Sequence, residues 1–295
     1  MILKNSFIER YKELTNFDEF MEINNIPLRN SLRVNTLKTT VKDMKARFMM
    51  KQVPWCDEGF FLESFALGNT PEHFMGYMYI QEAASMIPPV VLAPKEGDII
   101  LDIAAAPGSK TTQIAALTKN TGLIIANDVT VDRLKPLSVN LERCGVSNAV
   151  VTFNRGERIR GMQFDRILVD APCSGIGAIR KSPKTIQMYN VNIIKKLAIQ
   201  QKKLLYNSWK LLKKDGVLVY STCTLEPEEN EGVVDYLLEN FDDVSVEKIN
   251  LNIKSSKTVE EFNGVEYSSE VKKCLRIWPQ DNDTEGFFVA KLKKV

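Results

Sequence analysis

The stretch DIILDIAAAPGSKTTQIA, residues 98–115, decides the fold, because it predicts a buried strand, a tight turn and a helix in direct succession. The run DIILDIA supplies the strand, and small residues around Pro107 and Gly108 supply the turn. Small side chains let a ligand approach the backbone, and the first turn of the helix offers free amides to an anionic group. The glycine spacing of a dinucleotide fingerprint or of a phosphate-binding loop is absent. A tight turn that binds nothing is also compatible with this pattern.

The same alternation continues downstream of this stretch. Further apolar runs that predict buried strands occupy residues 123–128, 149–153, 164–170 and 216–222. Helical stretches lie among these runs at 110–118, 131–143 and 190–213, and a helix at 227–240, a strand at 243–248 and a last strand at 285–294 follow. Buried strands that alternate with helices indicate a parallel sheet covered on both faces. The predicted fold class is α/β, a three-layer sandwich.

The first 88 residues follow a different pattern. Helices are expected at 6–24 and 40–51, with a strand in the segment IPLRNSLRVNTLK between them. A short helix that Pro88 and Pro89 close is expected before the regular alternation begins. The predicted domains are therefore 1–88 and 89–295.

Composition excludes several classes of protein. No stretch of the 295 residues reaches the roughly 18 to 20 uninterrupted apolar residues that a membrane span needs. The N-terminus is charged and amphipathic, unlike a secretory signal, so a cytoplasmic location is expected. Five cysteines without a CxxC pair and a single histidine, His73, lack the spacing of a disulfide framework or a zinc site. We therefore expect free thiols and no metal.

The net charge of +2 conceals two basic blocks. Seven basic residues against one acid lie between Arg29 and Lys51, and ten basic residues with no acid lie between Arg180 and Lys214. Solvated helix faces explain any single lysine pair, but two long acid-poor blocks in a nearly neutral chain favour a polyanionic partner.

Polar residues follow the predicted strands where a parallel sheet binds its ligands, at the carboxyl edge. Asp128 ends the strand at 123–128, Asp170 and Cys173 follow the strand at 164–170, and Cys223 follows the strand at 216–222. Asp128 is suited to the ribose hydroxyls of a nucleoside, or to an ordinary helix cap. A thiol becomes a nucleophile as a thiolate, although a free cysteine is more often buried and inert. Two thiols at one edge beside an aspartate favour chemistry.

At this point the sequence resembles a known family. The segments LDIAAAPGSKT, DAPCSG, YSTCTLEPEENE and RIWPQDNDTEGFFVAKLKK resemble the RNA cytosine-5 methyltransferases of the Sun/NOL type, and LRVNTLK and GYMYIQEAASMIPPVVL resemble their RNA-contacting N-terminal part. The likeness runs from about Arg33 to Lys294, and the compact length is most like that of archaeal tRNA methyltransferases. It implies a Rossmann-like S-adenosylmethionine-dependent methyltransferase fold. The expected sheet is mostly parallel and seven-stranded with an antiparallel last strand, joined to a small α+β N-terminal part that binds RNA.

The resemblance also implies roles for individual residues. Cys223 would add to C6 of a flipped cytosine, Asp170 would hydrogen-bond N3, and Cys173 would assist loss of the C5 proton and product release. The cofactor residues carried over from the family's motifs are Ala105, Pro107, Gly108, Lys110, Asp128, Arg133, Asn154 and Asp170. The RNA contacts expected from the basic blocks are Arg29, Arg33, Lys38, Arg180, Lys181 and Lys184.

The sequence departs from the family pattern at several positions. Ala104 replaces a frequent cysteine, Ser109 replaces a glycine, and no histidine follows the proline of WPQD. Arg155, with Asn154 beside it, stands where the family has an aspartate for the adenine amine, and an arginine cannot accept a hydrogen bond from that amine. Either Asn154 substitutes or cofactor affinity is altered.

The resulting expectation is an RNA cytosine-5 methyltransferase that uses S-adenosylmethionine, acts on tRNA and works as a monomer. The alternatives are an rRNA enzyme and a non-catalytic RNA-binding or assembly factor that keeps the fold. A nicotinamide oxidoreductase would need the missing glycine fingerprint, and an N6-adenine methyltransferase would need a DPPY-like motif in place of DAPC.

Overall fold

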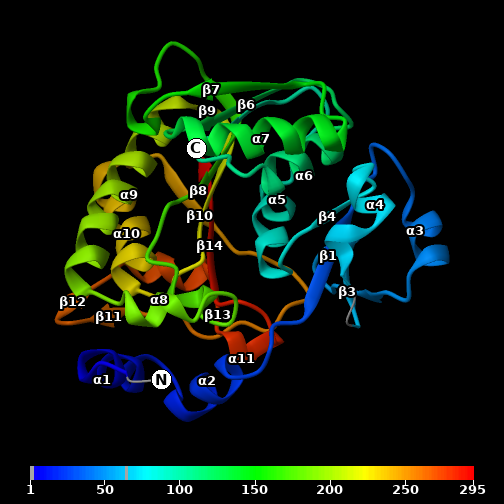
Figure 1. Ribbon diagram of the computed structural model, residues 1–295. Coiled ribbons are helices and arrows are strands. Elements are labelled where there is room, and N and C mark those ends of the chain that lie inside the picture. Colours follow the sequence, from blue (N-terminus) through cyan, green and yellow to red (C-terminus); the bar gives the residue numbers. More distant parts are fainter. Residues whose placement is uncertain (1–2, 64–65) are drawn as a thin grey trace.

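The computed structural model describes residues 3–63 and 66–295 and is built around one large sheet (Figure 1). Within the described residues, this sheet consists of β5 (Ile99–Asp102), β6 (Leu123–Asp128), β7 (Ala149–Phe153), β8 (Phe164–Asp170), β9 (Leu212–Thr222), β10 (Val244–Glu247), β13 (Leu275–Ile277) and β14 (Phe287–Lys294). The long apolar runs seen in the sequence form β5 to β9. The central strands β5, β8 and β9 are largely buried because helices cover both faces, whereas β7 is an edge strand on which Val150 and Phe153 are exposed.

The strand order is β10-β14-β9-β8-β5-β6-β7, with β13 paired to β14. Strands β5 to β9 pair in parallel, whereas β14 runs antiparallel between β9 and β10. The mostly parallel sheet with an antiparallel last strand is therefore confirmed. The short strand β13 was not predicted, because three residues carry too little periodicity to be recognised.

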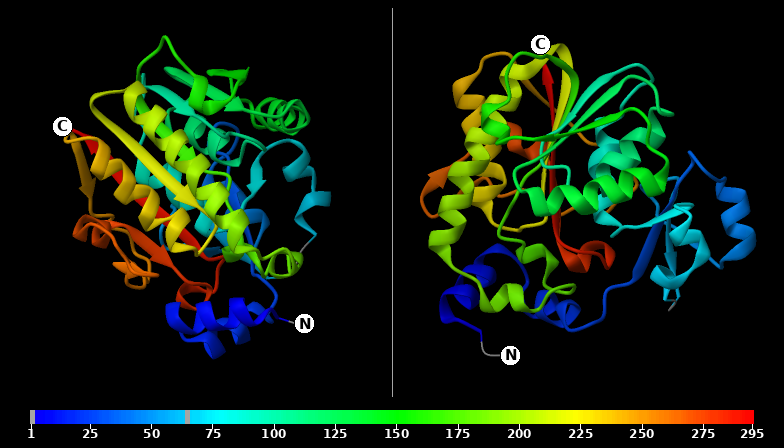
Figure 2. Two further views of the ribbon diagram at one scale, coloured as in Figure 1. Left: turned by 90° about the vertical axis from the view of Figure 1, so that its left-hand side faces the viewer. Right: turned by 45° about the horizontal axis from the view of Figure 1, so that its top comes forward.

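Helices form the outer layers. One face carries α9 (Val191–Leu211) and α10 (Glu231–Asn240), which lie in front of the sheet in the left view of Figure 2. The other side carries α5 (Ile87–Leu92), α6 (Ser109–Leu117) and α7 (Val131–Cys144). None of the helices among the described residues is both long and apolar enough to span a membrane.

A small antiparallel sheet lies beside these layers, at the right of Figure 1. Its order is β2 (Lys51–Gln52), β3 (Gly59–Leu62), β1 (Asn30–Val34) and β4 (Met78–Ile80), and α3 (Val41–Arg47) and α4 (Pro71–Phe74) accompany it. Leu32, Met44, Phe60 and Met78 form its own buried core. This sheet is the small α+β part that the sequence predicted.

The two N-terminal helices do not pack on the small sheet. The helix expected at 6–24 is two helices, α1 (Asn5–Leu14) and α2 (Phe17–Asn24), and Asn16 caps the second through the backbone amide of Glu19. They pack against α8 (Lys184–Gln187) and α11 (Pro279–Asn282), with Phe7 and Tyr11 near Tyr189 and Trp278. Helices α1 and α2 therefore cover the carboxyl end of the large sheet.

One predicted boundary was wrong in detail. Pro88 and Pro89 were expected to close a helix, but they lie in the first turn of α5. Proline fits there because the amides of a first turn have no partner within the helix. Helix α5 packs on the large sheet together with Trp55 and Phe61 of the N-terminal region, so one apolar core spans the predicted division. The division at residue 88 stays a prediction.

Candidate active site

The order of the strands places the expected site residues together. The chain runs outward from β5 through β6 to β7, then returns to lay β8 and β9 on the other side of β5. The carboxyl ends of β5 and β8 are therefore neighbours at the point where the strand order reverses. Open α/β sheets bind their ligands at this point. The loop after β5 and the segment after β8 face one another across this point.

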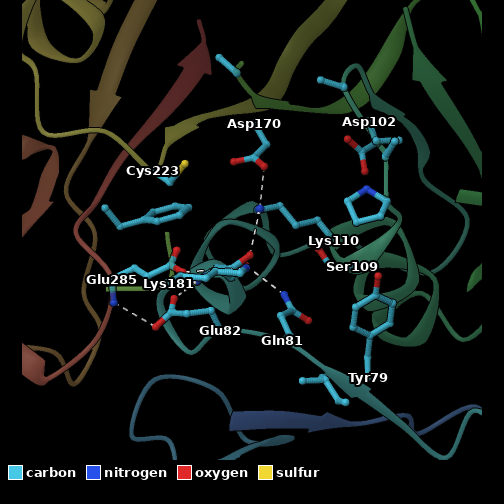
Figure 3. Close-up of a pocket in the computed structure, with 18 residues that line it drawn as sticks. Tyr79, Gln81, Glu82, Asp102, Ser109, Lys110, Asp170, Lys181, Cys223 and Glu285 are labelled. Atoms are coloured by element: carbon cyan, nitrogen blue, oxygen red, sulfur yellow. Dashed lines mark hydrogen bonds and ion pairs between the residues drawn. The ribbon is translucent and has the colours of Figure 1, made fainter. Parts of the chain in front are cut away.

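A cavity of about 400 Å³ opens at this edge (Figure 3). Tyr79 and Glu82 come from the N-terminal region, Lys110 from α6, Asp170 from β8, and Cys223 from the end of β9. The small residues from Ala104 to Pro107 form part of its wall. The N-terminal region and the large sheet thus enclose one cavity between them.

Asp170 lies at the centre of a polar network in this cavity. Its Oδ2 atom accepts from Lys110 Nζ at 2.6 Å, and its Oδ1 atom accepts from the Ser221 hydroxyl at 2.8 Å. Lys110 Nζ also donates to Ser85 Oγ at 3.0 Å. Burial opposes the charge on Lys110, but Asp170 more than compensates and the pKa of Lys110 is raised. The ammonium group is therefore retained inside the cavity.

The two thiols meet at the same edge. Cys173 Sγ and Cys223 Sγ lie 3.4 Å apart, and both residues are half-buried. The backbone amide of Gly177 donates to the carbonyl oxygen of Cys223 at 3.0 Å, which ties the two cysteine segments together. The hydrogen bond with Cys223, then burial and the charge of Glu229, raise the pKa of the Cys173 thiol well above its ordinary value. The two sulfurs thus have different surroundings.

The loop after β5 has the form that the sequence predicted. Gly108 adopts φ +103°, and its amide donates to the carbonyl oxygen of Ala105 at 2.7 Å. Beneath the loop lies Asp128, which is fully buried and accepts from the backbone amide of Ala106 at 3.2 Å. Arg133 donates to the carbonyl oxygen of Ala106 at 2.8 Å and lies 3.6 Å from Asp128. Asp128 and Arg133 therefore support the loop and do not line the cavity.

Asn154 and Arg155 lie farther out on the same edge. Both are exposed, and the backbone amide of Asn154 donates to the carbonyl oxygen of Asp128 at 3.3 Å. The Arg155 side chain pairs with Glu157 at 2.8 Å. Neither residue lines the cavity.

Comparison with known proteins places this site in a family. A family described as the 16S rRNA methyltransferases RsmB/F matches residues 89–293, and the N-terminal domain of the 16S rRNA methyltransferase RsmF matches residues 3–83. The chain belongs to the RsmB/F methyltransferase family. Its Rossmann-like methyltransferase fold and its class as an RNA methyltransferase agree with the expectations from the sequence.

Relatives within and near this family cover nearly all of the chain. A tRNA (cytosine(49)-C(5))-methyltransferase of Pyrococcus abyssi is 46% identical over 99% of the chain and 96% of its own length. A ribosomal RNA small subunit methyltransferase F of Photobacterium profundum is 42% identical over 99% of the chain, which spans 64% of that protein.

Two known structures have the same fold. A methyltransferase homolog protein from Pyrococcus horikoshii has a TM-score of 0.84 at 39% identity, covering 99% of the chain and 100% of its own. NSun6 from Pyrococcus horikoshii, crystallised with the S-adenosylmethionine analogue SFG, has a TM-score of 0.87 at 27% identity, covering 99% and 98%.

In this RsmB/F chain, two of the predicted RNA contacts are corrected. Arg33 is buried and donates to Gln81 and Thr112, and Arg180 is buried and donates to the carbonyl oxygens of Ile26 and Pro27. Both are structural arginines, and a buried guanidinium cannot reach a phosphate. The basic pattern was visible in the sequence, but burial was not.

The other four predicted contacts lie nearer to solvent. Arg29 already has partners within the protein, because its guanidinium pairs with Asp283 at 2.8 Å and stacks on the ring of Phe61. Lys38 is exposed at its amine and donates to two backbone carbonyls. Lys181 and Lys184 are exposed, and Lys181 also lines the cavity.

The structure adds acidic residues that sequence reasoning missed. Glu82 and Glu285 line the cavity, and Glu82 accepts from the backbone amide of Glu285 at 3.2 Å. Burial, and then the charge of Glu285, raises the pKa of Glu82. Burial also raises the pKa of Asp102, at the end of β5, to about 7. An acid inside an apolar segment, such as Glu82 in YIQEAA, was the available signal.

Among the described residues, no group of three or more His, Cys, Asp or Glu side chains gathers as a metal site would.

Proposed function

We propose that this protein is a tRNA cytosine-5 methyltransferase that uses S-adenosylmethionine and a pair of thiols. The observation that carries the proposal is that Cys223, which lines a cavity together with Asp170 and Lys110, lies with its sulfur 3.4 Å from that of Cys173. C5 of cytosine is a weak nucleophile. An enzyme overcomes this by adding a nucleophile to C6, which makes C5 electron-rich.

Cys223 is the better candidate for that nucleophile. It lines the cavity, and the positive charge of Lys110 interacts with it there. The thiolate is the form of a thiol that attacks. As the C6–S bond forms, the electron pair of the C5=C6 double bond moves toward C5, and N3 of the base gains the proton that the Cys223 thiol loses. Asp170 is placed to accept a hydrogen bond from that N3–H.

Cys173 is assigned to the second half of the reaction. After methyl transfer, C5 carries both the methyl group and a proton. When the C5 proton passes to water, its electron pair returns to the C5=C6 bond and the C6–S bond breaks. Cys223 leaves with the bonding pair and regains the proton held by N3. A sulfur 3.4 Å from the nucleophile is placed to assist this step. A binding factor without catalysis would need neither thiol, so the site favours the enzyme.

The residues around the cavity fit S-adenosylmethionine. When bound, this cofactor supplies an electrophilic methyl group on a sulfonium. The loop from Ala105 to Gly108 is built of small residues with a left-handed glycine, which lets a ligand lie against the backbone. Lys110 and Asp170 line the cavity and are assigned to the methionine end. Asp128 and Asn154 do not line it, and their assignment to the ribose hydroxyls and the adenine edge rests on the family resemblance.

RNA would approach over the basic residues near the cavity mouth. Lys181 and Lys184 are exposed, with Lys181 Nζ 3.9 Å from Glu285 Oε1, and they would meet phosphates while the target cytosine leaves its stack to reach Cys223. The Pyrococcus abyssi relative, matched over nearly its whole length, favours tRNA as substrate. An rRNA substrate is the second candidate, because several relatives of similar identity are named as ribosomal RNA methyltransferases. We also propose a cytoplasmic monomer.

Bisulfite sequencing tests the proposal directly. Purified protein is incubated with S-adenosylmethionine and with tRNA or 16S rRNA that lacks 5-methylcytosine. New bisulfite-resistant cytosines in tRNA are expected. Resistance confined to rRNA would replace the substrate assignment, and the absence of resistant sites in both RNAs with a cofactor-binding protein would favour a non-catalytic factor.

A further inference from the structure

A buried acid lies behind the Cys173 segment, outside the cavity itself. Glu229 follows β9 in a short 3-10 turn (Pro227–Glu229) and is fully buried. Its Oε2 atom accepts from the backbone amide of Ser174 at 3.0 Å and from Gln201 Nε2 at 2.7 Å. Its Oε1 atom is buried without a hydrogen-bond partner among the described residues. A carboxylate that is left half-satisfied in an interior is costly, so its retention needs a reason.

Glu229 and Gln201 hydrogen-bond to the backbone on both sides of Cys173. Gln201, on α9, donates to the carbonyl oxygen of Pro172 at 2.8 Å as well as to Glu229. Glu229 holds the amide of Ser174, the residue on the other side. The Ser174 hydroxyl in turn bonds Thr224 Oγ1 at 2.7 Å, next to Cys223. The position of Cys173 opposite Cys223 is therefore fixed from behind.

The same carboxylate makes the two sulfurs electrically unequal. The negative charge of Glu229 interacts with Cys173, while the positive charge of Lys110 interacts with Cys223. A negative neighbour opposes formation of a thiolate, so Glu229 helps to keep Cys173 protonated. It acts on only one of two sulfurs that lie 3.4 Å apart.

The other titratable groups packed around Cys173 and Glu229 are already engaged. The Tyr220 hydroxyl donates to the carbonyl oxygen of Glu229 at 2.6 Å. Glu226 accepts from Arg10 and Tyr11. The amide of Gly175 interacts with Cys173. Burial raises the pKa of Glu229 to about 7, so its negative charge is present in the alkaline range where a thiol titrates.

We propose that Glu229 is the positioning residue that gives the two thiols different roles. It fixes the Cys173 segment through Ser174 and Gln201, and it places a negative charge on the Cys173 side of the sulfur pair. Cys223 is then the thiol that attacks, and Cys173 is held back for the release step. The inference rests on the proposed function for the meaning of those roles, but the geometry and the charge can be tested without RNA.

Alkylation by iodoacetamide tests the charge. In a Cys223→Ala background, the rate of Cys173 alkylation is measured against pH by peptide mass mapping. Glu229→Gln keeps an oxygen that can accept from Ser174 and Gln201 but removes the charge. We expect its alkylation midpoint to fall by about one pH unit, so that Cys173 reacts about tenfold faster at pH 8. The matched control is Glu226→Gln, which neutralises a neighbouring buried acid that faces Arg10 and Tyr11. If the pH midpoint of Cys173 alkylation were the same in Glu229→Gln as in the control variant, the proposal would be overturned.

A second variant tests the hydrogen bonds that position Cys173 and leaves the carboxylate of Glu229 in place. Gln201→Leu, with both cysteines intact, removes the donor to Pro172 and Glu229. With tRNA and S-adenosylmethionine, we expect the covalent protein–RNA adduct to accumulate as in Cys173→Ala, because the release step has lost its geometry. Adduct levels equal to those of the wild type would contradict the positioning role. If Cys173→Ala itself forms no adduct, the proposed function fails, and the alkylation result still decides the role of Glu229.

Discussion

At the scale of one residue, the protonation of Asp102 is coupled to the stability of the fold. It ends β5 and lies buried below the small-residue loop. Thr111 donates to its Oδ2 atom at 2.7 Å, and its Oδ1 atom has no hydrogen-bond partner in the part of the chain that the structure describes. Burial raises its pKa from 3.8 to about 7, so the folded chain binds a proton that the unfolded chain releases. The contribution of Asp102 to stability is therefore greatest below pH 4, falls as the pH rises, and reaches its lowest value above pH 7.

Asp102→Asn should remove this pH dependence. An asparagine oxygen can still accept from Thr111, and no charge forms when the pH rises. We expect the variant to be more stable than the wild type at pH 8 by about 2–4 kcal/mol, with a smaller difference at pH 5. Urea unfolding of both proteins at the two pH values measures this. A difference that does not change with pH would show that the carboxyl group titrates normally.

The location of a site residue could be predicted from the sequence where that residue directly follows a strand. Asp170, Cys173 and Cys223 follow long apolar runs, so the topology of an α/β sheet alone brings them to one edge. Glu229 and Gln201 carry no such signal, because they act from a turn and from the buried face of a helix. Their role follows from contacts across 28 residues of sequence, which no local pattern records.

At the level of elements, a close crossing of backbone holds together the segments that carry Cys173 and Cys223. The amide of Gly286, before β14, donates to the carbonyl oxygen of Gly177 at 2.9 Å, and the amide of Gly177 donates to that of Cys223. A Cβ on Gly177 would lie 2.1 Å from the carbonyl oxygen of Gly286 and 2.8 Å from that of Cys223. Only glycine fits at this crossing, since a Cβ would force apart the backbones of Gly286 and Cys223.

Gly177→Ala should therefore separate the two segments. We expect a loss of about 1–3 kcal/mol in stability, as for other overpacked sites, and a larger fall in methyl transfer than the loss of folded protein explains. Gly68→Ala is the control, because a Cβ there meets a single atom at 4.0 Å. Thermal unfolding and transfer of labelled methyl to tRNA are the measurements. Unchanged transfer in Gly177→Ala would mean that the crossing does not position Cys223.

Long, periodic elements were predicted well and short ones were not. The strands at 123–128, 149–153 and 164–170 match the observed bounds, because each is a continuous apolar run, although β7 at 149–153 is an edge strand that is not buried. The sequence did not reveal β13, α8 or α11, which are each three or four residues long. The break between α1 and α2 was missed since Asn16 caps a helix without a glycine or proline to mark it.

For the whole molecule, the basic residues near the cavity mouth define how RNA would approach. Lys184, in α8, is exposed close to the carboxyl edge, whereas Lys119 lies after the far end of α6 and pairs with Glu96. Each lysine that meets a phosphate releases a counterion, so removing it lowers the salt dependence of binding.

Lys184→Ala should reduce the slope of log affinity for tRNA against log salt by about 1, and Lys119→Ala should leave the slope unchanged. Filter binding at several salt concentrations measures both. Equal slopes for the two variants would remove Lys184 from the RNA path.

The overall organisation was only partly visible in the sequence. The α/β core and a smaller N-terminal part were predicted, but α1 and α2 proved to pack beneath the large sheet, away from the small sheet with which they were grouped (Figure 1). Arg33 and Arg180 illustrate the same limit, since each sits in a basic block yet binds buried groups far away in sequence. Such long-range partners depend on the packing of the complete molecule.

Covalent trapping of RNA tests the central claim most directly. Wild type, Cys223→Ala and Cys173→Ala are each incubated with labelled tRNA and S-adenosylmethionine and run on a denaturing gel. We predict that Cys223→Ala neither methylates tRNA nor forms a complex, whereas Cys173→Ala accumulates a protein–RNA complex that resists denaturation. Full turnover by Cys223→Ala, or an adduct that depends on Cys173 alone, would contradict the assignment of the two thiols.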